Sequence, residues 1–98
     1  MDPDWLLHHT RQSPPLLRER VQQYAEAATG PTPAMALSAA AESALNQVLG
    51  HPGDRSIALD LLAADALITL ALLAQAQTAP EQLEEFAVAV LGTWRFRR

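Results

Sequence analysis

The sequence predicts an all-α protein: a small antiparallel four-helix bundle with a short extra helix at its N-terminus. Apolar residues recur every three or four positions in successive segments, a spacing that places them on one face of a helix. Residues that start and stop helices stand between these segments, and no segment shows the alternation typical of a half-buried strand. We therefore expect residues 1–98 to form a single helical domain with short loops.

The first two helices are expected at about residues 3–10 and 14–29. An aspartate near the start of the first can accept hydrogen bonds from free N–H groups of its first turn. The second begins with two prolines, which are tolerated there because the first-turn N–H groups have no partner in the helix. Its apolar face has the spacing i, i+4, i+7, i+11 and consists of Leu17, Val21, Tyr24 and Ala28.

Two longer helices are expected at about residues 33–49 and 55–77. Thr32 can cap the first of them, and Gly50 is expected to end it in a left-handed conformation. The second is apolar nearly all round, which is typical of the centre of a bundle or of a helix covered by a second subunit. Most leucines of this helix lie away from one side that carries mainly small side chains. The residues of this small side are Ser56, Asp60, Ala63, Ala64, Ala71, Ala74 and Gln75.

The last helix is expected at about residues 79–91. Thr78 and Glu81 have the spacing of a capping box, in which the two residues satisfy free N–H groups at a helix start. Gly92 is expected to end the helix and to leave residues 93–98 as a tail.

Composition excludes several kinds of chemistry. The chain has no cysteine and no lysine, so thiol nucleophiles, Cys-ligated zinc and Schiff-base chemistry are excluded. Histidines 8 and 9 are adjacent and point in different directions on a helix, and no pair of histidines has the spacing of a helical metal site. We expect no cofactor and no metal.

Charge and hydropathy bear on the cellular location of the protein and on its binding partners. The net charge of −4 argues against binding to nucleic acid, and the acidic start lacks the basic-then-apolar order of a secretory signal. Residues 57–76 are apolar over a length that could span a bilayer, but Asp60 and Asp65 would each cost about 2.5–3.5 kcal/mol near its centre. We therefore expect a cytoplasmic protein without a transmembrane segment.

Asp65 is the most unusual residue of the apolar helix. Its side of the helix holds alanines and leucines, and Thr69 is the only polar neighbour there. One interpretation is a buried carboxylate with a raised pKa that anchors a ligand together with Thr69. The other, which we favour, is a structural aspartate with an internal hydrogen-bond partner. In either case, we expect replacement of Asp65 by alanine to be more disruptive than replacement of Asp60.

The loop before the apolar helix contains His51 and Arg55, which could bind an anion near the helix start. A Pro-Gly turn followed by a capping aspartate explains most of this loop without any ligand, and we favour that interpretation.

The C-terminal residues alternate aromatic and basic side chains: Trp94, Arg95, Phe96, Arg97 and Arg98. Aromatic residues and arginine dominate binding hot spots, so this tail is the best candidate for contact with a partner. The equal alternative is that the aromatic residues fold back onto the bundle.

Together, these features favour a non-catalytic module that self-associates or docks on another protein. The contact would use an alanine and leucine face of the helices at 33–49 and 55–77 together with the tail, and a homodimer is the simplest assembly. The alternative is a bundle that binds a small ligand or a metal with Asp65 as its polar anchor.

Overall fold

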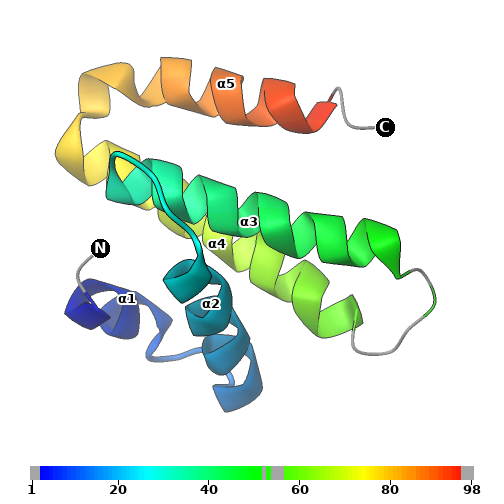
Figure 1. The fold of residues 1–98 in the computed structure, drawn as a ribbon. Coiled ribbons are helices and arrows are strands. Elements are labelled where there is room, and N and C mark those ends of the chain that lie inside the picture. The colour runs from blue at the N-terminus through cyan, green and yellow to red at the C-terminus, as the bar shows by residue number, and fades with distance from the viewer. Residues whose placement is uncertain (1–2, 52, 54–56, 96–98) are drawn as a thin grey trace.

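The computed structural model describes residues 3–51, 53 and 57–95. Over these residues the protein is all-α, as predicted, and contains no strand (Figure 1). The described elements are α1 (Pro3–Thr10), α2 (Pro15–Ala27), α3 (Pro33–Gly50), α4 (Ile57–Thr78), the short 3-10 helix η1 (Pro80–Gln82) and α5 (Leu83–Arg95).

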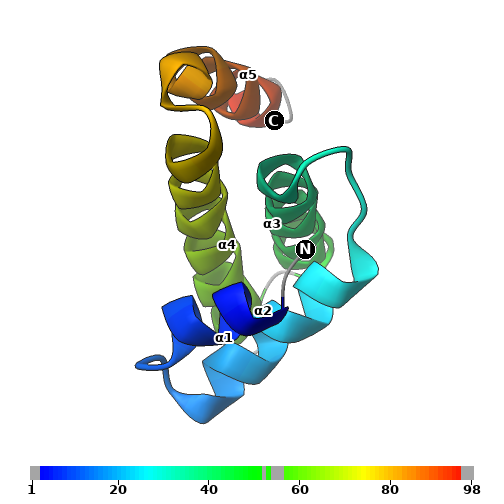
Figure 2. The same cartoon turned by 90° about the vertical axis from the view of Figure 1, so that its left-hand side faces the viewer.

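Helices α3 and α4 form an antiparallel pair at the centre and make the most extensive contact among the described elements (Figure 1). Helix α2 lies across this pair on one side, and α5 lies on the opposite side (Figure 2). The antiparallel alignment expected for four helices is thus seen for α3 and α4, whereas α2 crosses them. At the N-terminus, Leu6 of α1 is buried and Trp5 Nε1 donates to Gln77 Oε1 of α4 over 2.8 Å.

Small side chains line the contact between α3 and α4. The fully buried alanines are Ala40, Ala41 and Ala44 of α3 with Ala63 and Ala71 of α4. Alanine allows two helix backbones to approach closely, and Leu37 and Leu67 fill the remaining space as the largest buried side chains of this pair. The pair therefore buries the small side of α4, and most leucines of α4 lie elsewhere on the helix.

The predicted start of α3 is confirmed, because Thr32 Oγ1 accepts a hydrogen bond from the Met35 amide over 3.2 Å. The predicted capping box at Thr78 is wrong. Helix α4 extends to Thr78, whose hydroxyl donates to the Ala74 carbonyl oxygen over 2.8 Å, so Thr78 does not stand at the cap position of the next element. Ala79 takes the cap position of η1 without a side-chain bond.

The predicted left-handed conformation of Gly50 and the predicted helix stop at Gly92 are also wrong. Gly50 is the last residue of α3, but Gly53 is the only described residue with a positive φ, so Gly50 is not left-handed. Gly92 lies inside α5, which continues to Arg95. Glycine costs about 1 kcal/mol relative to alanine in a helix interior, a penalty that a helix can absorb.

Candidate functional site

The side of α4 opposite its fully buried alanines presents apolar side chains to solvent. Leu61 and Leu62 are 51% and 54% exposed. At 100° per residue, the neighbouring residues cover about one third of the helix circumference. We call this surface the α4 outer face: Ala58, Leu61, Leu62, Asp65, Ile68, Thr69 and Leu72.

A hollow of about 420 Å³ opens on this surface, where the α4 outer face meets α3. Leu45 of α3 forms one wall. The other lining residues come from α4 and are Leu61, Leu62, Ala64, Asp65 and Ile68. The hollow is thus an apolar surface that contains a single carboxylate.

Asp65 is exposed, so the expectation that it is buried is wrong. Within the described part of the chain, no side chain pairs with its carboxylate. The Thr69 hydroxyl donates to the Asp65 carbonyl oxygen over 3.0 Å, which leaves the carboxylate unaffected. Asp65 is exposed because the alanine contact with α3 turns the small side of α4 inward. Asp65 and its leucine neighbours therefore face outward.

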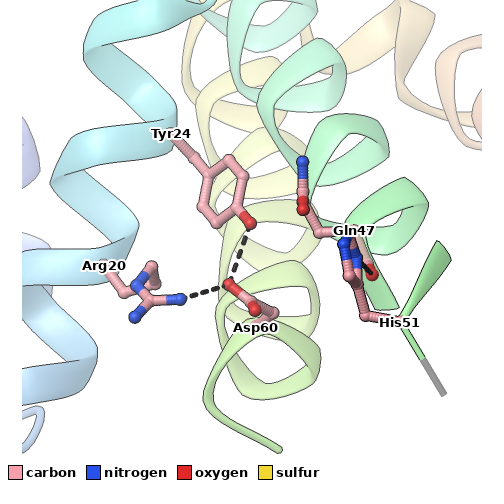
Figure 3. Close-up of polar contacts among 5 residues, drawn as sticks. All are labelled: Arg20, Tyr24, Gln47, His51 and Asp60. Atoms are coloured by element: carbon pink, nitrogen blue, oxygen red, sulfur yellow. Dashed lines mark hydrogen bonds and ion pairs between the residues drawn. The ribbon is translucent and has the colours of Figure 1, made fainter. Parts of the chain in front are cut away.

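The buried aspartate is instead Asp60, in the first turn of α4, which is 6% exposed. Arg20 Nη1 lies 2.5 Å from Asp60 Oδ1, and the Tyr24 hydroxyl donates to the same oxygen over 2.8 Å (Figure 3). Arg20 and Tyr24 are four residues apart and thus share one face of α2. These contacts hold α2 across α4 and give Asp60 the internal partners that had been expected for Asp65.

The pKa of Tyr24 is raised from its ordinary value of 10.0 to about 12, chiefly by partial burial and in addition by the hydrogen bond to Asp60. The folded state therefore favours the protonated phenol. Its contribution to stability is complete below pH 10 and is lost as the pH rises towards 12.

This linkage predicts an alkaline titration that can be followed in a single group, because the chain has one tyrosine. The ultraviolet absorbance of tyrosinate should show a midpoint near pH 12 in the folded protein and near 10 in denaturant. The free energy of unfolding should fall between these pH values in the wild type and much less in Tyr24→Phe. A folded-state midpoint near 10 would contradict the hydrogen bond to Asp60.

Of the remaining predicted site residues, those that the structure describes do not line the hollow at Asp65. His51 is exposed beyond the end of α3, where its ring Nδ1 donates to the Gln47 carbonyl oxygen over 3.1 Å (Figure 3). It does not line the hollow at Asp65. Trp94 and Arg95 belong to the last turn of α5. Arg55 and residues 96–98 lie outside the described residues.

In the described ranges, no group of three or more histidine, aspartate or glutamate residues is placed to hold a metal ion. Helix α4 is long and apolar enough to cross a membrane, which is weak evidence because the core helix of a soluble protein meets the same criterion. No protein family model matches the chain, and neither the curated proteins nor the solved structures include a match.

Proposed function

We propose that this chain is a non-catalytic helical module that associates with a protein through the α4 outer face and the C-terminal residues 94–98. A homodimer is the simplest assembly. The observation that carries the proposal is the exposure of Leu61 and Leu62 beside the hollow, because contiguous apolar surface on a small protein commonly marks an interface.

We place this module in the cytoplasm and outside the bilayer. In a membrane, Asp65 would lie among lipid tails near the middle of the α4 outer face, at a cost of about 2.5–3.5 kcal/mol. The Asp60 and Arg20 pair would also have to be moved out of water or separated. A protein surface can cover the same leucines while it offers a partner to the carboxylate. With a net charge of −4, nucleic acid is not the partner we propose.

A single substitution tests this function. Leu62→Glu should raise the dissociation constant of the dimer by at least about a hundredfold. The proposed dimer covers Leu62 of each copy, so the substitution would place two charges in the interface. Sedimentation velocity and light scattering would report the change in mass. Leu16→Glu is the matched control, since Leu16 is 69% exposed on α2 and lies outside the α4 outer face.

Two outcomes would contradict the proposal. One is a wild-type protein that is monomeric at the highest attainable concentration and binds no protein in its host. The other is self-association that Leu62→Glu leaves unchanged.

The second candidate function is binding of a small ligand in the hollow, with Asp65 as its polar anchor. The observation that favours it is the carboxylate among apolar walls in about 420 Å³, a volume within the range of small-molecule sites. The complementary ligand is a small apolar cation, such as a hydrophobic amine. Amide chemical shifts around Ile68 should move on titration with such an amine and should stay fixed in Asp65→Asn if this function holds.

A further inference from the structure

The hollow on the α4 outer face restricts the chemistry of whatever covers it. Its walls include Leu45, Leu61 and Ile68, and its one charge is the carboxylate of Asp65. An occupant that covered Asp65 without pairing it would incur the cost of burying an uncompensated charge. The occupant must therefore bring apolar or aromatic groups together with a cation.

The chain contains one segment of this composition. All seven basic residues are arginines, and three of them lie among the last four residues. Arg20 is already paired with Asp60, and Arg18 donates to the Arg11 carbonyl oxygen. Only in residues 94–98 do arginines alternate with large aromatic side chains. Arginine next to an aromatic ring suits both the carboxylate and the apolar walls.

We infer that the C-terminal segment 94–98 of a second copy of this chain occupies the hollow, with its arginines paired to Asp65. This inference rests on the self-association proposed above and names the partner of that surface. A second copy is favoured because Asp65 and its leucine neighbours stay exposed in the single chain although α5 is in place up to Arg95. In a two-fold dimer the contact occurs twice, because each copy gives its segment and receives the other.

Charge reversal on each side of the contact tests the inference. Asp65→Arg and the double variant Arg97→Glu, Arg98→Glu each place like charges together in both contacts of the homodimer. Each should weaken the dimer by about tenfold or more, as expected for two partly exposed ion pairs that become repulsive. Glu19→Arg is the matched control for Asp65→Arg, because it makes the same charge change at an exposed position of α2 and should leave dimerisation unchanged.

Mixing the two variants gives the decisive measurement. In the mixed dimer, the arginine introduced by Asp65→Arg in one copy faces the two introduced glutamates of the other copy. The second contact joins the unchanged Asp65 of the double variant to the native C-terminal arginines of its partner. Both contacts are therefore attractive again, and sedimentation velocity of the mixture should show a heterodimer within about threefold of wild-type affinity. Docking of the segment onto its own chain could not be rescued in this way.

The outcomes separate this inference from the proposed function. Rescue on mixing supports the second copy as the occupant. If Leu62→Glu dissociates the dimer but mixing restores nothing, the α4 outer face is an interface and the inference about segment 94–98 is overturned. A wild-type chain that stays monomeric overturns the inference as well.

Discussion

Replacement of Ala71 by leucine should destabilise the protein by about 3 kcal/mol, because the added atoms have no room between α3 and α4. Ala71 is fully buried, and so are three alanines of α3, the helix with which α4 makes its most extensive contact. The extra carbons at this contact must either push the two backbones apart or force side chains out of their preferred rotamers. Chemical denaturation at low protein concentration would measure the loss.

The matched control is Ala27→Leu. Ala27 is exposed at the end of α2, and leucine and alanine have similar helix propensities, so this change should alter the free energy of unfolding by less than about 0.5 kcal/mol. Equal effects at the two positions would mean that α3 and α4 do not pack through their alanines.

The same contact explains which parts of the fold were predictable. The bounds of α1 and the cap at Thr32 follow from local chemistry, so the sequence indicates them well. The orientation of α4 depends on which of its sides packs well against α3. This fit depends on the side chains of both helices, so the pattern of α4 alone does not indicate it. The sequence shows the small side of α4, but its pattern does not indicate that this side, rather than the leucine side around Asp65, is the buried one. Alanines on both helices of a neighbouring pair would have been the signal for burial of the small side.

The candidate site was predictable to a similar extent. Asp65 and the C-terminal arginines stand out by composition, and the hollow on the α4 outer face adds Leu45 from α3, whose approach no local pattern indicates. The contact of Asp60 with Arg20 and Tyr24 is not evident from the sequence because Asp60 lies 40 and 36 residues away from them. Arg20 and Tyr24 have a helical spacing that hints at a shared target, but only the crossing of α2 over α4 identifies that target as Asp60.

Asp60→Ala should destabilise the protein by about 2 kcal/mol, and Asp65→Ala by less than about 0.5 kcal/mol, the reverse of the order expected from the sequence alone. Loss of Asp60 leaves the Arg20 guanidinium and the Tyr24 hydroxyl without their shared acceptor. The side chain of Arg20 is 30% exposed, so water can replace part of the lost interaction and the cost stays below that of a fully buried pair.

A double-mutant cycle with Arg20→Ala separates the ion pair from the other effect of Asp60, which also favours the start of α4 through the helix dipole. We expect a coupling energy of about 1 kcal/mol between the two residues, measured by denaturant unfolding. Additive effects would show that Asp60 does not act through Arg20. In that case, the position of α2 would depend on the packing of Val21 and Ala25 and on the hydrogen bond from Tyr24 to Asp60.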